Sequence, residues 1–365
     1  MSTNNQLSST SSQPLYPKKS EKIVGNKRKY RRYNWIFLLS VFFPVVTVGV
    51  FNIFVDPYDV FNTPNFLGIN HLKPRKDNTD RLKKAIDIIR IKPVTVLIGS
   101  SITKQGLDPN HPAFNNEQPV YNLGLNSANI YELRPYIEHV FANQKELDLI
   151  ILGLDFFMFD TLLKNRANFS ENRLEKRHIS STDLLNISLS LNAFLPSTET
   201  VAYSKKIPPD SIGYGENGFT PYRNPDPEKT LELFRRNLGA YYKMYTKYKL
   251  PIELTELKKI VDFCAQKKIK LILFISPSHA IYWEIIQIAG KSSTWEKWKR
   301  KVVEISDVFD FSGYNSITSE PINNKTKNYK DSYHYINHVG NLILNRILSY
   351  KEEEVPEDLG ILINP

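Results

Sequence analysis

An uncharged apolar stretch of 21 residues, Trp35–Val55, constrains the fold of this chain more than any other feature. It contains one strongly polar side chain, Asn52, and one proline, Pro44. At a rise of about 1.5 Å per residue, a helix of this length crosses the hydrocarbon core of a bilayer. A cleaved signal peptide would need a shorter apolar core and a small-residue cleavage site, and neither is evident. The sequence therefore predicts an uncleaved transmembrane helix at 35–55.

Basic residues are concentrated directly before this stretch. Residues 1–34 contain eight Lys or Arg and one acidic residue, Glu21, so they carry +7 of the formal net charge of +10. Basic flanks stay on the cytoplasmic side of a membrane, so we expect the N-terminus inside and residues 56–365 outside the cytoplasm. A nucleic-acid-binding domain would carry its basic excess on the folded part of the chain. The lipid bilayer is therefore an expected partner and nucleic acid is not.

Composition divides the chain into segments. Residues 1–17 are rich in Ser, Thr, Asn and Gln, whereas residues 56–78 contain three prolines and no periodic pattern. The single cysteine, Cys264, excludes an intrachain disulfide and reads as a small buried hydrophobe. We predict a disordered basic tail at 1–34, a transmembrane helix at 35–55 and a connector at 56–78. An α/β domain follows at 79–350, with an insertion at 160–250, and a C-terminal tail at 351–365.

Short apolar runs alternate with helical patterns through most of the domain. Unbroken runs of this kind are typical of strands buried on both faces of a parallel sheet. The expected strands are 94–99, 120–124, 147–155, 269–277 and 308–313, and the expected helices are 79–91, 127–143, 253–267, 281–305 and 338–350. The pattern predicts an α/β fold, a parallel sheet with helices on both faces.

The insertion at 160–250 interrupts this alternation. It contains no strong apolar strand and is rich in Asn, Ser, Tyr and Pro, with one helical pattern at 227–247. We expect it to be mainly helical and to lie over the strand ends.

Polar residues follow the expected strands, where ligands of open α/β sheets bind. The first strand ends on Gly99-Ser100-Ser101, and "YKDSYHYINHVG" before the last helix places Asp331 and His334 in a D-x-x-H spacing. A serine nucleophile needs a base, and the base needs an acceptor that fixes its tautomer. Asp331 and His334 supply such a pair if His334 reaches Ser101 in space.

The order of these blocks resembles that of the SGNH/GDSL hydrolase superfamily. G-S-S after strand one, a glycine block after strand two, G-x-D after strand three and D-x-x-H near the C-terminus carry the resemblance over roughly residues 80–350. More narrowly, the chain resembles membrane-anchored SGNH-like proteins of cell-envelope polymer O-acylation, as in alginate O-acetylation and teichoic-acid D-alanylation. The resemblance implies a three-layer fold and no cofactor. It also implies Ser101 as nucleophile, His334 as base and Asp331 as its partner, with N–H groups of Ser101 and Gly124 as oxyanion donors.

The third block departs from the family pattern. The family usually has Asn there, a neutral donor to the oxyanion, whereas this chain has Asp155. An ionised carboxylate repels the developing negative charge, so Asp155 helps only if it is protonated. Otherwise Asp155 binds a substrate hydroxyl, or Asn126 supplies the donor. His279, which follows a strand, is a further candidate for substrate contact or for a capping role, and no metal site is expected.

Two functions from different classes follow. The first is a serine esterase or O-acyltransferase that acts on an envelope polysaccharide through an acyl-enzyme on Ser101, with an acyl-donating membrane protein as a possible partner. The second is a catalytically inactive SGNH-like carbohydrate-binding or assembly component, which Asp155 favours. The presence of Ser101, Asp331 and His334 together favours the enzyme.

Overall fold

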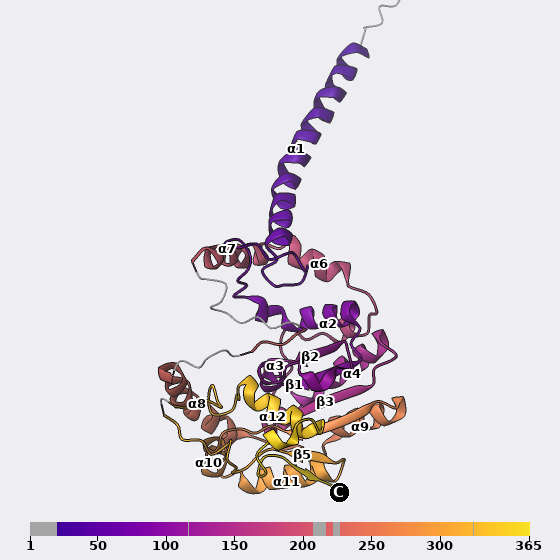
Figure 1. The fold of residues 1–365 in the computed structure, drawn as a ribbon. Coiled ribbons are helices and arrows are strands. Elements are labelled where there is room, and N and C mark those ends of the chain that lie inside the picture. Colours follow the sequence, from indigo (N-terminus) through magenta and orange to yellow (C-terminus); the bar gives the residue numbers. More distant parts are fainter. Residues whose placement is uncertain (1–19, 116, 207–216, 222–226, 324) are drawn as a thin grey trace, which may run out of the picture.

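The computed structural model describes residues 20–115, 117–206, 217–221, 227–323 and 325–365, and its centre is a six-stranded sheet (Figure 1). The strand order is β2-β1-β3-β4-β5-β6, with β1 to β5 parallel and β6 antiparallel to β5. The strands are β1 (Thr95–Gly99), β2 (Val120–Gly124), β3 (Leu149–Leu154), β4 (Lys270–Ile275), β5 (Val308–Asp310) and β6 (Ile361–Ile363). The prediction of an α/β fold around a mostly parallel sheet is confirmed.

The first three strands explain the unbroken apolar runs. Every residue of β1, β2 and β3 is buried, so none of these strands has a solvent-facing side that would need polar residues. Strand β1 pairs with β2 on one side and with β3 on the other. The chain therefore changes direction across the sheet at β1, and such a switch point opens a crevice beyond the carboxyl end of the strand.

Four of the five helices predicted for the α/β core lie at the predicted positions, and the short helix that begins at Ser101 was not predicted. The core helices include α2 (Asp80–Ile91), α3 (Ser101–Gly106), α4 (Ile130–Asn143), α9 (Thr255–Lys267) and α12 (Asn337–Ile347), and short 3₁₀ turns lie at Lys76–Thr79, Pro112–Phe114 and Phe156–Phe159. The single helix expected at 281–305 is wrong. It divides into α10 (Ala280–Ile288) and α11 (Ser292–Val303). Gly290 between them has φ +70°, a left-handed conformation that ends helices and that glycine adopts without strain.

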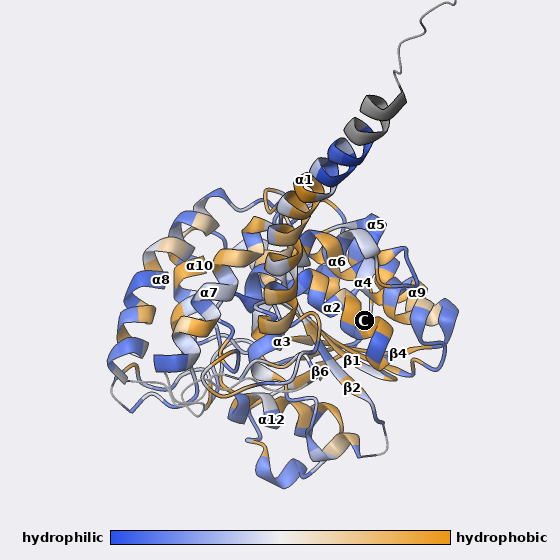
Figure 2. Ribbon diagram, turned by 90° about the horizontal axis from the view of Figure 1, so that it is seen from above, coloured by the Kyte–Doolittle hydropathy of each residue, from blue (hydrophilic) through white to orange (hydrophobic). Residues whose placement is uncertain are grey.

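The N-terminal helix α1 (Ser20–Val55) is longer than predicted and stands out from the rest of the molecule (Figure 1). The expectation of a disordered tail over residues 1–34 is wrong from Ser20 onward, and residues 1–19 lie outside the described part. Within α1, Lys27–Val55 is long and apolar enough to cross a membrane, by length and composition. In the view from above, the basic turns of α1 are blue and the following turns mainly orange (Figure 2).

The insertion has two parts in different places. Helices α5 (Glu171–Leu174), α6 (Ser181–Ser188) and α7 (Leu191–Lys206) come first, and α6 and α7 pack at the base of α1. The second part approaches the strand ends, where α8 (Pro227–Lys247) packs against α10. The expectation that the whole insertion covers the strand ends is therefore wrong, because α6 and α7 pack with the end of α1 and the connector.

The C-terminal residues are not a free tail. A 3₁₀ turn at Glu352–Glu354 leads to β6, whose Leu362 pairs with Phe309 of β5. A three-residue apolar run is too short to be recognised as a strand from periodicity. The boundary predicted at 351 is accordingly wrong, since β6 completes the sheet edge.

Candidate active site

The turn from β1 into α3 explains why a buried strand ends on Gly-Ser-Ser. Ser100 is the N-cap of α3, and its hydroxyl accepts a hydrogen bond from the Ile102 N–H at 3.1 Å. The same hydroxyl donates to Asp155 Oδ2 at 2.5 Å, which ties the turn to the end of β3. A Cβ atom on Gly99 would lie 2.2 Å from Thr103 Oγ1, so only glycine fits there. The turn leaves Ser101 as the first residue of α3.

Ser101, His334 and Asp331 form a hydrogen-bonded chain. The Ser101 Oγ lies 2.9 Å from His334 Nε2, and His334 Nδ1 lies 2.9 Å from Asp331 Oδ2. Asp331 Oδ1 also accepts from the backbone N–H groups of Tyr333 and His334, at 3.0 and 2.9 Å. The structure thus brings together the three residues that the sequence singled out, in the order nucleophile, base and orienting carboxylate.

The charge of Asp331 is stabilised in place. Burial raises the pKa of this carboxyl, but the nearby His334 and the two backbone N–H donors lower it more, so the pKa lies below its ordinary value. Asp331 therefore remains an acceptor, which suits the role of holding a proton on Nδ1 of His334. His334 Nε2 is then free to accept the proton of Ser101.

A close helix contact sets the distance between the serine and the histidine. Helix α3 carries Ser101, and α12, which packs against α3, follows directly on the segment that carries His334. A Cβ atom on Gly340 of α12 would lie 1.8 Å from the Gly106 carbonyl oxygen of α3. The two backbones touch where both residues are glycine. The sequence pattern gave no sign of this contact.

The oxyanion side of Ser101 differs from the prediction. The Gly124 N–H donates to the Asn122 side-chain oxygen at 2.9 Å, so it is not available to an oxyanion in this structure. The Asn122 amide nitrogen in turn donates to the carbonyls of Thr103 and Leu107. Gly124 instead allows close packing, because a Cβ atom there would lie 2.3 Å from the backbone nitrogen of Lys104. The proposed donor role of Gly124 is corrected accordingly.

Asp155 directly follows β3 and accepts a hydrogen bond from Ser100 in the turn from β1 to α3. Its side chain is buried, and burial raises the pKa of this carboxyl, although the Ser100 hydroxyl counteracts this. Its second oxygen, Oδ1, has no hydrogen-bond partner among the described residues. A cavity of about 10 Å³ adjoins Asp155 and is also lined by Ser276, Trp283 and Tyr333. Asp155 therefore supports the turn that presents Ser101.

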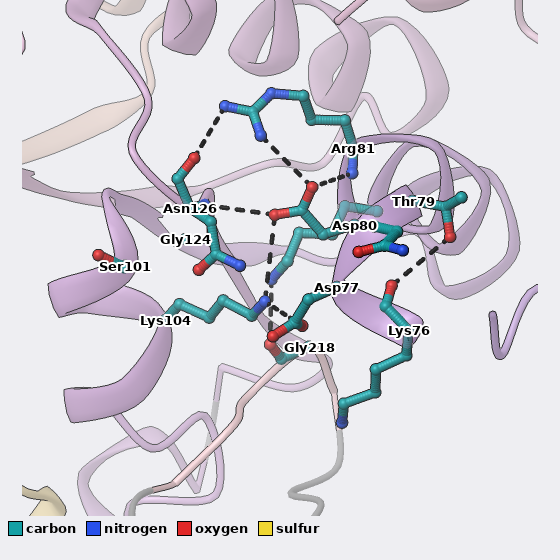
Figure 3. Close-up of polar contacts among 12 residues, drawn as sticks. Lys76, Asp77, Thr79, Asp80, Arg81, Ser101, Lys104, Gly124, Asn126 and Gly218 are labelled. Carbon is teal, nitrogen blue, oxygen red and sulfur yellow. Dashed lines mark hydrogen bonds and ion pairs between the residues drawn. The ribbon is translucent and has the colours of Figure 1, made fainter. Parts of the chain in front are cut away.

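Asn126 remains available as a donor. Its backbone N–H donates to Asp80 Oδ2 at 3.3 Å and its carbonyl accepts from Arg81 at 3.1 Å, while its side-chain amide forms no hydrogen bond with any described residue (Figure 3). The figure shows Asn126 on the side of α3 near Ser101 and Lys104. The Asn126 backbone is thus held at two points, and no described residue uses its side-chain amide.

His279 is a structural residue and not a member of this cluster. It is the N-cap of α10 and accepts from the Ile281 N–H at 3.2 Å. Its other nitrogen lies 2.9 Å from the Glu320 carbonyl, and its ring packs on Phe234 and Tyr329. Burial lowers the pKa of His279, which keeps it neutral. Both ring nitrogens are engaged, so the predicted substrate contact gives way to the capping role.

Two tyrosines near the serine were missed by the sequence analysis. The ring of Tyr333 lies edge-on to His334 with centroids 4.4 Å apart, and burial raises the pKa of its hydroxyl, an effect that the nearby Ser101 side chain partly offsets. Tyr241 of α8 packs on Tyr333 at 5.1 Å. The second part of the insertion thus reaches the site through α8. The only sequence signal was the position of Tyr333 beside His334.

A charged cavity of about 500 Å³ lies on the other side of Lys104. Its wall combines basic and acidic side chains from the connector, α2 and α3, with backbone from residues 217–220. Lys104 pairs with Asp77 at 2.7 Å, as Figure 3 shows. Burial lowers the pKa of Lys76 in this wall to about 7. This cavity adjoins the helix that carries Ser101 but does not contain the serine.

Comparisons with known proteins add no relative. No protein-family model matches the chain, and no curated protein sequence matches it. The functional argument therefore rests on the residues and their geometry.

Proposed function

We propose that this protein is a membrane-anchored serine esterase or O-acyltransferase that works through an acyl-enzyme on Ser101. The observation that carries the proposal is the hydrogen-bonded chain from the Ser101 hydroxyl through His334 to Asp331. A serine beside a neutral histidine whose far nitrogen is held by a carboxylate is the arrangement that acyl transfer requires. Its position after β1, at the switch point of the sheet, also suits a ligand site.

The chemistry follows from the atoms in place. Ser101 Oγ attacks the carbonyl carbon of an acyl ester while His334 Nε2 takes its proton, and Asp331 stabilises the resulting imidazolium. The tetrahedral oxyanion is stabilised by the Asn126 amide and by the Ser101 N–H at the start of α3. Collapse of this intermediate releases the alcohol, which receives the proton from His334. Water or a sugar hydroxyl then attacks the acyl-enzyme by the reverse sequence, giving hydrolysis or transfer.

The substrate and the cellular side belong to the same proposal. Basic residues before the apolar span favour a cytoplasmic N-terminus, which places the catalytic domain outside the cytoplasm. An acylated envelope polysaccharide then becomes the natural substrate class, with an acyl-donating membrane protein as the source of the acyl group. The resemblance to SGNH-like O-acylation proteins, with their three-layer fold, supports this assignment.

One observation favours the alternative of a catalytically inactive carbohydrate-binding or assembly component. The N–H of Gly124 is occupied by Asn122, and Asp155 is directed to Ser100, so two positions expected to stabilise the oxyanion do not do so. A protein that kept the fold but lost the reaction would tolerate both changes. The two functions differ in whether Ser101 is reactive.

A fluorophosphonate probe separates them without knowledge of the substrate. The full-length protein in detergent micelles is treated with the probe, next to Ser101→Ala and His334→Gln variants. His178→Gln is the matched control, since His178 is an exposed histidine in the segment between α5 and α6. Labelling of the unmodified protein and of His178→Gln, with none in Ser101→Ala and strongly slowed labelling in His334→Gln, is expected. Absence of labelling in the unmodified protein would support the binding component instead.

A further inference from the structure

Helices α6 and α7 present an unusual surface at the base of α1. No residue from Leu184 to Thr198 is charged. Five large apolar side chains on these helices and the turn between them are exposed, and we call them the apolar platform: Leu185, Leu189, Leu191, Phe194 and Leu195. Leu191 is 76% exposed and Leu195 63%. A cluster of this kind is uncommon on a surface that faces water.

Three hydroxyl side chains of α7 lie on its inner side. Ser197, Thr200 and Ser204 are buried, and Ser197 Oγ donates to Asn52 Oδ1 of α1 at 2.8 Å. The usual arrangement of a surface helix places apolar residues inside and polar residues outside. Its reversal over this part of α7 indicates that the outer environment is itself apolar.

The platform is fixed to the end of the apolar span. Asn52, the one strongly polar residue of that span, is fully buried and donates to the Ser188 carbonyl at 2.8 Å. Phe51 and Phe194 pack with ring centroids 5.7 Å apart. A Cβ atom on Gly49 would lie 2.5 Å from Leu189 Cδ2, so α1 and the platform are in direct contact. One face of the span is therefore covered by protein from about Gly49 onward, whereas Val50, Ile53 and Phe54 on its other faces remain exposed.

The part of the span before the platform is too short to cross a bilayer by itself, so the last turns, which still expose Val50, Ile53 and Phe54, lie in the hydrocarbon as well. The rise from Trp35 to Gly49 is about 21 Å, whereas the hydrocarbon core is about 30 Å thick. The difference of about 9 Å falls at the level of the platform. Amphipathic helices that lie in the interface insert their apolar faces by about 5–10 Å. Immersion of the platform therefore makes up the missing thickness.

We propose that α6 and α7 lie in the membrane interface, with the apolar platform inserted among the lipid acyl chains beside α1. Figure 1 shows both helices lying across the base of α1, between it and the sheet. The occupant of the platform is the bilayer, because the platform continues the surface of the apolar span. This inference rests on the proposed membrane anchor, and its test separates the two.

Depth-dependent quenching tests the proposal on the full-length chain. The buried Cys264 is replaced by Ala, and single cysteines are introduced by Leu195→Cys or Leu191→Cys and labelled with a polarity-sensitive fluorophore. The protein is reconstituted in phosphatidylcholine–phosphatidylglycerol vesicles with or without acyl-chain nitroxide lipids. Phe42→Cys reports the anchor, and Ile288→Cys, 73% exposed on α10, is the control for a position in water.

We expect blue-shifted, lipid-quenched emission at positions 195, 191 and 42, and unshifted emission at 288 that aqueous iodide quenches. Quenching by lipid at 42 together with iodide quenching at 195 and 191 would overturn the inference and leave the anchor standing. Iodide quenching at all four positions would overturn both. The introduced cysteines replace exposed side chains, and the unfolding midpoint of the cysteine-free Cys264→Ala protein shows that the shared background substitution preserves the fold.

Discussion

The two sides of Ser101 differ in how their hydrogen-bonding groups are used. On the base side, His334 and Asp331 point their polar atoms at one another and at the serine. On the oxyanion side, Gly124 and Asp155 direct theirs into the protein, to Asn122 and Ser100. The base side is thus complete without a ligand, whereas the other side depends, in the proposed mechanism, on the Asn126 amide and the Ser101 N–H. We therefore expect the oxyanion side to limit the rate of the proposed reaction.

The largest expected effect on this comparison comes from Asp331→Asn. Asparagine keeps the shape but removes the charge that holds the proton on His334 Nδ1. In serine triads this loss lowers kcat by about 10⁴-fold. Steady-state hydrolysis of an acylated sugar ester measures it, with His178→Gln as control. Retention of full activity by Asp331→Asn would show that His334 is not oriented by this carboxylate.

The second test concerns the contact between α3, which carries Ser101, and α12, which follows the segment that carries His334. Gly340→Ala places a methyl group against the Gly106 carbonyl, and overpacking of this kind costs about 1–3 kcal/mol. We expect a lower unfolding midpoint together with slower probe labelling, since α3 must move away from α12. Gly239→Ala is the control, because a Cβ atom there meets nothing within 4 Å. Equal stability of the two variants would contradict the close contact.

The smallest effect is expected at Asp155. Burial raises the pKa of this carboxyl in the folded protein above its ordinary value of 3.8, so the folded state binds the proton more tightly than the unfolded state. Stability is therefore lost as the pH rises from that value through the higher folded pKa. Asp155→Asn can still accept from Ser100 and lacks this loss. A tenfold difference in proton affinity corresponds to about 1.4 kcal/mol.

Urea unfolding of both proteins between pH 3 and pH 8 measures this difference. We expect the free energy of unfolding of Asp155→Asn to rise relative to that of the unmodified protein as the pH rises. At the acid end of the range this difference should disappear. Parallel pH profiles would show that Asp155 is ionised without cost in the fold.

The sequence predicted the elements whose signal is local. Unbroken apolar runs located β1 to β5, and the placement of Ser101 and His334 at the ends of elements brought out the triad. The use of Gly124 was not predictable, because it depends on the Asn122 side chain, which folds back on its own strand. The site of α6 and α7 was also hidden, since the sequence analysis recognised no helical pattern at 181–206 and their place beside α1 depends on the fold.

The burial of Asn52 against α6 and α7 has a consequence for how the proposed enzyme would meet its substrate. A domain on a flexible linker can take many positions around its membrane anchor. This domain is instead held against the end of α1 by the hydrogen bonds of Asn52 and the contacts around it. Ser101 then lies at a fixed height above the membrane. A substrate is within reach only if its acyl group lies at that height. Lengthening of the connector would not extend that reach so long as Asn52 remains clamped.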